Sequence, residues 1–250
     1  MPRADQLLVE RGLASSRSLA QRLIATGVRW QTHTGIWQNV SKNGDVLPHD
    51  CPLELVDDSE SRYVSRGGLK LEGALRTTGL QVAGLRCLDV GQSTGGFTDV
   101  LLHQGALHVT GIDVGQGQLH PTLQQDPRVR CIEKCNARTL SMQMFAAEPL
   151  FDLVVVDASF ISLTLLVPAL VNLLTPTGLL LTLVKPQFEL QPEDIGKAGL
   201  VKDPAKYQDV ENRLRDCCAQ YGVEVLQWLP SPITGGDGNR EFFMYGRRAR

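Results

Sequence analysis

LDVGQSTGGFTD, residues 88–99, decides the fold of this 250-residue chain. Apolar residues predict a strand that ends at Asp89, and glycines at positions 91, 95 and 96 allow a tight loop before a helix. A strand, a glycine-rich loop and a helix form a ligand-binding corner in α/β domains, because the N–H groups at the helix start face the ligand. The stretch therefore predicts a ligand site where this strand ends.

The spacing inside this loop indicates which ligand it binds. The pattern is Asp-x-Gly-x-x-x-Gly-Gly, in place of the Gly-x-Gly-x-x-Gly of dinucleotide-binding domains. A carboxylate suits the amino-acid end and the sulfonium of S-adenosylmethionine, whereas it would repel a pyrophosphate. A generic nucleotide-binding loop is the alternative, because a glycine-rich turn alone is weakly specific. The residues expected to bind S-adenosylmethionine here are Asp89, Gly91, Ser93, Gly95, Gly96 and Phe97.

A second acid supports this assignment. Asp113 ends the next predicted strand, about 20 residues beyond the loop, where an acid can accept both ribose hydroxyls of a cofactor. A capping or surface aspartate is the alternative. Asp126, Asn136 and Arg138 follow, and they are candidates for contacts with the adenine edge or with RNA. Of these three, Asn136 is included among the expected cofactor-binding residues.

Strand and helix patterns alternate from residue 67 onward. Apolar strands that alternate with helices predict a doubly wound, mostly parallel sheet with ligands at the carboxyl ends of its strands. The expected strands are 86–90, 108–114, 151–157, 179–184, 222–229 and 241–246, and the expected helices are 68–77, 96–104, 163–174 and 205–221. The glycine-punctuated stretch 196–203 is expected to be a loop beside the site, either a substrate clamp or a connector.

The first 60 residues predict a separate small α+β domain. Apolar residues at helical spacing predict helices over 5–12 and 15–26, with Ser15 or Ser16 as a cap, and short strand patterns follow after Gly27. The helical part resembles the S-four-type (alpha-L) RNA-binding motif, although WQTH replaces the family's usual Val-Asn-Gly hairpin. The resemblance implies an RNA-binding domain over 1–60, a linker over 61–66 and the α/β domain over 67–250. The arginines expected to bind RNA are Arg3, Arg17 and Arg22.

Composition limits the other classes of function. A hydrophobic fraction of 42% and a charged fraction of 21% are ordinary for a globular protein, and no apolar run reaches the roughly 18 residues of a membrane helix. No secretory signal pattern opens the chain, so a cytoplasmic location without a membrane partner is expected. The six cysteines form no Cys-x-x-Cys pair. Cys131 and Cys135 are expected to pack in the core, and no metal site is predicted.

Further motifs resemble a known family. SRGGLKL, DVGQSTGGFTDVLL, VVVDASFISL, LLTLVKPQFE and NREFFMY are similar, in this order, to motifs of the TlyA or haemolysin-A family of FtsJ-type RNA 2′-O-methyltransferases. This resemblance covers nearly the whole chain. It implies a Rossmann-like S-adenosylmethionine-dependent methyltransferase domain and structured RNA as the substrate, in particular ribosomal RNA or ribosomal subunits. It also implies a Lys-Asp-Lys-Glu catalytic tetrad at Lys70, Asp157, Lys185 and Glu241.

The four residue types make chemical sense together. A ribose 2′-hydroxyl is a poor nucleophile, so a base must take its proton as the oxygen attacks the methyl group. A lysine can do so if burial and a second cation lower its pKa. We expect Lys185 to be the base, Asp157 to position it, and Lys70 and Glu241 to steady the hydroxyl and the amine. Alternatively, Lys70 is an exposed helix lysine and Glu241 a surface acid.

Two other functions remain as alternatives. The family also carries the name haemolysin, but the sequence offers no span or cationic amphipathic helix for membrane damage. A non-catalytic RNA-binding protein is the second alternative. Base N-methyltransferases usually have Asn/Asp-Pro-Pro-Tyr/Phe where this chain has Asp157-Ala158-Ser159-Phe160, which favours a ribose target. The oligomeric state stays open, with a monomer as one expectation.

Overall fold

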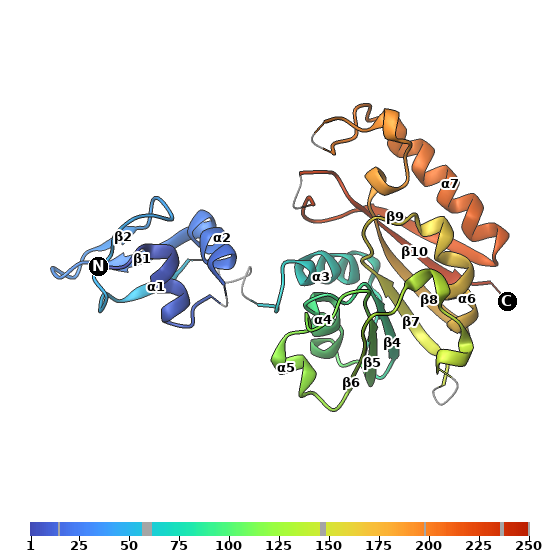
Figure 1. Ribbon diagram of the computed structural model, residues 1–250, viewed down its shortest axis with the longest axis horizontal. Coiled ribbons are helices and arrows are strands. Elements are labelled where there is room, and N and C mark those ends of the chain that lie inside the picture. Colours follow the sequence, from blue (N-terminus) through green and yellow to red (C-terminus); the bar gives the residue numbers. More distant parts are fainter. Residues whose placement is uncertain (15, 57–61, 146–148, 198, 236–237, 250) are drawn as a thin grey trace. The chain divides into compact units, whose positions relative to one another are not determined.

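The computed structural model describes residues 1–14, 16–56, 62–145, 149–197, 199–235 and 238–249 (Figure 1). The chain forms two compact units, Met1–Arg66 and Gly67–Arg250. In the described ranges, none of the helices has the length and apolar character that a membrane crossing requires.

Unit 1 packs two helices on a small antiparallel sheet. Its elements are α1 (Ala4–Glu10), α2 (Arg17–Gly27), β1 (Val28–Gln31), β2 (Trp37–Asn39) and β3 (Leu53–Leu55), with strand order β2-β1-β3. Ser16 caps α2 by accepting a hydrogen bond from the Leu19 N–H at 3.2 Å, as one of the two serines was predicted to do. Ser15 and residue 61 of the predicted linker lie outside the described residues.

Unit 2 is built on a seven-stranded sheet of order β6-β5-β4-β7-β8-β10-β9. The first five strands in this order are parallel, and β10 runs antiparallel to both β8 and β9. This arrangement confirms the doubly wound, mostly parallel sheet. The strands are β4 (Arg86–Val90), β5 (His108–Ile112), β6 (Val129–Ile132), β7 (Phe151–Val156), β8 (Leu174–Val184), β9 (Val223–Pro230) and β10 (Phe242–Arg248).

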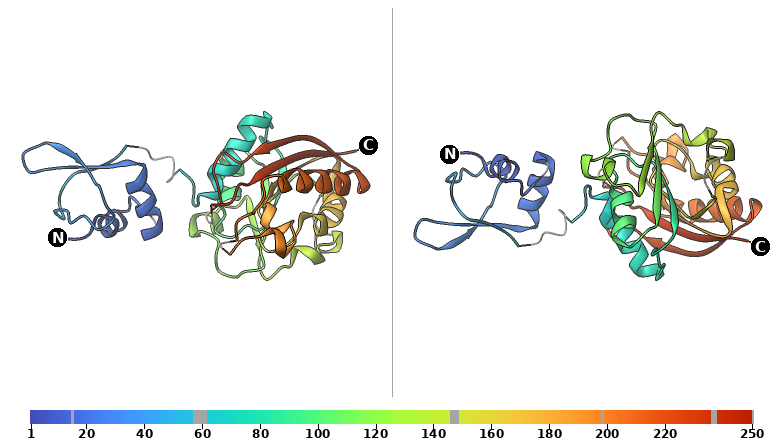
Figure 2. Two further views of the ribbon diagram at one scale, coloured as in Figure 1. Left: turned by 90° about the horizontal axis from the view of Figure 1, so that it is seen from above. Right: turned by 90° about the horizontal axis from the view of Figure 1, so that it is seen from below.

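Helices cover both faces of this sheet. The helices α3 (Gly67–Thr78) and α4 (Gly96–His103) lie on one face, and α6 (Val167–Leu173) and α7 (Lys206–Gln220) lie on the other (Figure 2). Side chains of the central strands are buried on both faces, because Leu88 and Leu153 alike have no exposed surface. The shorter helices are α5 (Pro121–Gln124), η2 (Ala137–Thr139), η3 (Met142–Phe145), η4 (Leu163–Leu165), η5 (Pro186–Phe188) and η6 (Pro192–Asp194).

The sheet differs from the predicted one at two places. Strand β6 was missed because it is a short, half-exposed edge strand without a continuous apolar run. The predicted helix over 163–174 is instead η4 followed by α6, and β8 begins at Leu174 rather than at residue 179. Pro176 explains the early change to extended backbone, because a proline disfavours helical conformation in the residue before it.

Candidate active site

A cavity of about 910 Å³ opens at the carboxyl ends of β4, β5 and β7. This volume is within the range of small-molecule sites, about 300–1,000 Å³. Apolar and polar side chains share its wall, and those used below are Gly91, Ser93, Asp113, Asn136, Asp157 and Phe160. The cavity therefore lies where a doubly wound sheet is expected to bind its ligand.

The glycine-rich loop is held by a close backbone approach at Gly91 and by hydrogen bonds to Asp113. A side chain at Gly91 would place its Cβ 2.4 Å from the carbonyl oxygen of Asp157, and Gly91 has a φ of +85°. The Ser93 N–H donates to Asp113 Oδ2 at 2.7 Å, and the Gly115 N–H donates to Asp113 Oδ1 at 2.7 Å. Gly91, Ser93 and Asp113 thus form one wall, as the predicted cofactor contacts require.

Asp89 takes a different position from the one expected. Its side chain is fully buried and does not line the cavity; Asp89 Oδ2 accepts a hydrogen bond from the Thr98 hydroxyl at 2.7 Å. Thr98 in turn accepts from the Gln92 amide at 2.9 Å. Burial raises the pKa of Asp89 to about 7, against the bond from Thr98. Asp89 therefore supports the glycine-rich loop through Thr98 and Gln92, and its strand position points its side chain into the core.

Gly95, Gly96 and Phe97 also lie away from the cavity wall. Gly95 has a φ of +96° and precedes α4, and a Cβ there would come within 2.3 Å of Leu123. Phe97 is buried, and its ring stacks on Phe243 with centroids 6.2 Å apart. The glycines allow the tight turn into α4 and Phe97 packs α4 on the sheet, so the sequence pattern identified the loop but not each contact.

The segment after β6 supplies a further part of the cavity lining. Asn136 and Arg138 line the cavity, and Asn136 Oδ1 caps η2 by accepting the Arg138 N–H at 3.0 Å. Asp126 is instead paired with Arg128 at 2.7 Å. Cys135 is buried as expected, whereas Cys131 is exposed because it lies on the edge strand β6.

The first ion pair of the predicted tetrad follows β7 and β8. Lys185 Nζ lies 2.5 Å from Asp157 Oδ1 and donates to the Ser159 hydroxyl at 2.9 Å. Because β7 and β8 are parallel neighbours, their carboxyl ends place these two residues side by side. Asp157 and Ser159 both line the cavity. Asp157 therefore places this pair at the edge of the cavity in which a ligand can bind.

The second ion pair joins α3 to the start of β10. Lys70 Nζ lies 2.6 Å from Glu241 Oε2, and their side chains are 11% and 3% exposed. A Cβ at Gly73, one turn after Lys70, would lie 2.6 Å from Pro232, so the glycine lets α3 approach this segment closely. Such burial excludes the alternatives of an exposed helix lysine and a surface acid.

Sheet register brings the two pairs together. Phe242, the first residue of β10, pairs with Val184, the last residue of β8. Glu241 and Lys185 are the next residues outward, so they lie at the same end of this antiparallel pair. Burial raises the pKa of Glu241, while Lys70 and Lys185 lower it and Asp157 raises it further. All four predicted catalytic residues thus lie within electrostatic reach of one another.

Several residues beside these pairs were not singled out from the sequence. Phe160 is 90% exposed, has a φ of +61°, and its ring lies 5.0 Å from that of Phe188. Asn239 is buried; its Nδ2 donates to the Gly199 carbonyl at 2.9 Å and its Oδ1 accepts the Val201 N–H at 3.3 Å. The position of Asn239 two residues before Glu241 was the available signal.

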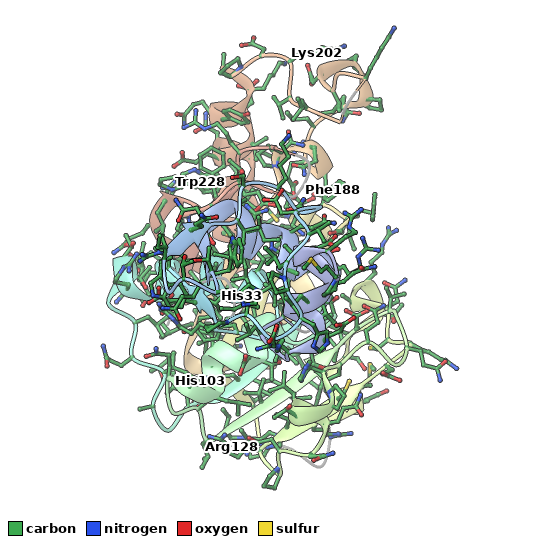
Figure 3. The ribbon with its side chains drawn as sticks, turned by 90° about the vertical axis from the view of Figure 1, so that its left-hand side faces the viewer. His33, His103, Arg128, Phe188, Lys202 and Trp228 are labelled. Carbon is green, nitrogen blue, oxygen red and sulfur yellow. The ribbon has the colours of Figure 1, made fainter. Side chains whose placement is uncertain are left out.

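Asn239 therefore joins the predicted loop 196–203 to the start of β10. Residue 198 of this loop lies outside the described residues. Lys202 lies on the same loop, at the opposite end of unit 2 from His103 and Arg128 (Figure 3).

Unit 1 has its own cluster of charged residues. Asp5 is fully buried and accepts hydrogen bonds from Arg3 at 3.1 Å and from Arg17 at 2.9 Å. Burial raises the pKa of Asp5, but the bonds from Arg3, Arg17 and Gln21 outweigh it and hold the pKa well below its usual range. Arg3 and Arg17 remain about half exposed. Arg22 lies on the same helix as Arg17 and donates to the Ser18 carbonyl at 3.3 Å.

The fold and the site together define the class of protein, a Rossmann-like methyltransferase. A solved S-adenosylmethionine-dependent methyltransferase from Mesorhizobium loti has this fold, with a TM-score of 0.52 at 16% identity, covering 70% of this chain and 96% of that one. The family model described as FtsJ-like methyltransferase matches residues 63–248. This chain belongs to the FtsJ-like methyltransferase family.

Relatives are similar over nearly the full length. The chain is 42% identical to 16S/23S rRNA (cytidine-2′-O)-methyltransferase TlyA from Mycobacterium tuberculosis, covering 98% of this chain and 89% of the relative. It is 35% identical to Hemolysin A from Brachyspira hyodysenteriae, covering 97% and 98%. A solved structure of a candidate hemolysin from Streptococcus thermophilus is 39% identical, with a TM-score of 0.76, and covers 99% of this chain and 88% of that chain. These findings confirm the family that the motifs predicted.

Proposed function

We propose that this protein is an S-adenosylmethionine-dependent methyltransferase that methylates ribose 2′-hydroxyls of ribosomal RNA. One observation carries the proposal: Asp157, paired with Lys185, lines the cavity, and the buried Lys70–Glu241 pair lies within electrostatic reach of both. A non-catalytic RNA-binding protein would have no need to bury two lysines and two acids beside a cofactor-sized cavity, because buried charges are costly.

The residues present fit S-adenosylmethionine. Asp113 would bind the ribose hydroxyls, because each of its carboxylate oxygens keeps acceptor capacity beyond the one backbone bond it makes. Gly91 and Ser93 would hold the amino-acid end, and Asn136 would lie near the adenine. When bound, the cofactor supplies an electrophilic methyl group on a sulfonium.

The lysine and acid pairs would then act on the ribose. Lys185, in its neutral form, would accept the proton of the 2′-hydroxyl, and the oxygen would take the methyl group that the cofactor supplies. Asp157 and Ser159 hold the Lys185 amine at the cavity wall. Lys70, paired with Glu241, provides a second positive charge that stabilises the developing negative charge on the oxygen.

The target class follows from the strand end and from the relatives. The sequence Asp157-Ala158-Ser159-Phe160 lacks the prolines typical of base N-methyltransferases. Relatives from Mycobacterium tuberculosis and Campylobacter jejuni are named rRNA (cytidine-2′-O)-methyltransferases. Because the cavity and both pairs come from one chain, a monomer suffices for the reaction, and ribosomal subunits would be met in the cytoplasm.

Unit 1 would bind the RNA. We assign residues 1–60 to an S-four-type RNA-binding domain, with 61–66 as the linker to the methyltransferase domain. The buried Asp5 holds Arg3 and Arg17 while leaving about half of each exposed, which suits contacts with phosphate. Arg22 would add a third contact from α2.

Transfer of a tritium-labelled methyl group to purified ribosomal subunits tests the proposal. We expect label on a ribose 2′-oxygen with the wild-type protein and none with Lys185→Ala, while both bind S-adenosylmethionine in calorimetry. Glu224→Gln, which alters an exposed ion pair with Arg247 on β9 and β10, is the matched control and should transfer label normally. Label on a base, or full transfer by Lys185→Ala, would reject the proposed reaction.

A further inference from the structure

Glu189 is a buried carboxylate that the proposed reaction does not use. It follows η5 and is 4% exposed. Its Oε1 accepts the Leu163 N–H at 2.7 Å, and its Oε2 accepts the Ser162 hydroxyl at 2.6 Å and Arg213 at 3.2 Å. The Arg213 guanidinium also donates to the backbone carbonyl of Glu189. One side chain thus joins the loop after β7, the turn after β8 and helix α7.

These bonds constrain the loop strongly. A carboxylate is costly to bury unless its oxygens are hydrogen-bonded, and leaving any of these partners unmet adds a further cost. Burial raises the pKa of Glu189, and the bonds from Ser162, Leu163 and Arg213 oppose that rise. Once Glu189 is in place, Ser162 and Leu163 have little freedom to move.

The loop that Glu189 holds forms a wall of the cavity. Asp157, Ser159, Phe160 and Ser162 all line the cavity, and Ser159 accepts the hydrogen bond from Lys185. Phe160 has a positive φ of 61°, which is strained for a residue with a bulky side chain. Strained backbone persists only where the surrounding structure fixes it. The bonds of Glu189 begin two residues after Phe160.

We infer that Glu189 is a positioning residue for methyl transfer. Through Ser162 and Leu163 it holds the loop 157–162 against the strand end that carries Lys185, so that cavity wall and base keep one geometry. Its effect on the rate rests on the proposed function, whereas its effect on cofactor affinity requires only that the cavity binds S-adenosylmethionine.

The test compares Glu189→Ala and Glu189→Gln in the full chain. We expect kcat to fall about 100-fold for alanine and about tenfold for glutamine, because a misplacement of about 1 Å can cost a factor of about 100. The glutamine keeps an oxygen for Leu163 but loses the charge that pairs with Arg213. The Kd for S-adenosylmethionine, measured by calorimetry without RNA, should weaken about tenfold for alanine.

A variant with a purely structural effect serves as the control. Val82→Ala removes buried side-chain volume between α3 and β4, outside the core cluster that contains Leu163. We expect it to lower the melting temperature while kcat and Kd stay within about twofold of wild type. If Glu189→Ala does not fold, Glu189→Gln carries the test. Folded Glu189 variants with kcat and Kd within twofold of wild type would overturn the inference.

A double-mutant cycle with Ser159→Ala identifies the route of the effect. If Glu189 acts through the loop, Glu189→Gln should cost less in a chain that already lacks the Ser159 hydroxyl than in wild type. Losses in kcat that simply multiply would contradict this route. If the wild-type protein binds cofactor but methylates no ribose, the proposed function fails, and the Kd comparison still tests Glu189.

Discussion

The two lysine–acid pairs of the active site use the same chemical groups in different surroundings. Asp157 lines the cavity and is 22% exposed beside Lys185 at 12%, whereas Glu241 in the second pair is 3% exposed and does not line it. The two lysines are about equally buried, so the pairs differ mainly in the exposure of their acids. Loss of the first pair should therefore act mainly on the rate, whereas loss of the second should also cost stability, and the following experiments test that difference.

The largest effect should come from Lys185→Ala. Loss of a general base costs about 100- to 10,000-fold in rate, so kcat for RNA methylation should fall by about that factor. Because Asp157 keeps some solvent exposure, the loss of unfolding free energy should stay near 1 kcal/mol, within the range of typical substitutions. Single-turnover kinetics and denaturant unfolding measure the two quantities. A large stability loss with intact kcat would reverse the roles of the pairs.

Lys70→Met should show the opposite balance. It leaves Glu241 buried without its partner, which costs about 3–5 kcal/mol when a buried pair is broken. Because burial already raises the pKa of Glu241, its protonation at low pH should relieve part of that cost. Urea unfolding at two pH values measures this cost. Lys206→Met, which breaks an exposed ion pair on α7, is the control. An unchanged stability would show that the pair contributes nothing.

Gly73→Ala should disturb the Lys70–Glu241 pair without changing any charge. The added Cβ would lie 2.6 Å from Pro232, so α3 must shift and Lys70 must move from Glu241. Overpacking of this kind costs about 1–3 kcal/mol. Gly79→Ala would be a poor control because Gly79 has a positive φ. Alanine and glycine variants at the exposed position Arg76 on α3 measure helix propensity alone. Wild-type stability in Gly73→Ala would mean that the close approach is not needed.

Asp89 should give the stability a dependence on pH. Its pKa rises from 3.8 to about 7 on folding, so the folded state binds more protons than the unfolded state between these values. Stability from this group is complete below about pH 4 and is lost as pH rises through about 7, at up to about 1.4 kcal/mol per pH unit. The difference in unfolding free energy between wild type and Asp89→Asn should show this slope. A flat difference over pH 4–7 would mean that Asp89 stays ionised.

The sequence predicted most of the sheet from its own patterns, whereas the full tetrad came from the family resemblance. Apolar strands and the residues at their ends are local patterns, so Asp157 and Lys185 could be placed from their own neighbours. The direction of a side chain at a given position is not local. Asp89 and Phe97 belong to the most informative stretch, yet the fold directs both into the core. Glu189 gave no signal beyond its motif, because its partners Ser162 and Arg213 lie about 25 residues away on either side.

The placement of β10 has a consequence for the newly made chain. Although β10 is the last strand in sequence, it lies between β8 and β9, and Glu241 comes directly before it. A nascent polypeptide can complete the glycine-rich loop and the Lys185–Asp157 pair well before residue 241 has been translated. Lys70 then has no counter-ion and the sheet has a gap beside β8. The Lys70–Glu241 pair thus forms only after residue 241 has been made, later than the Lys185–Asp157 pair.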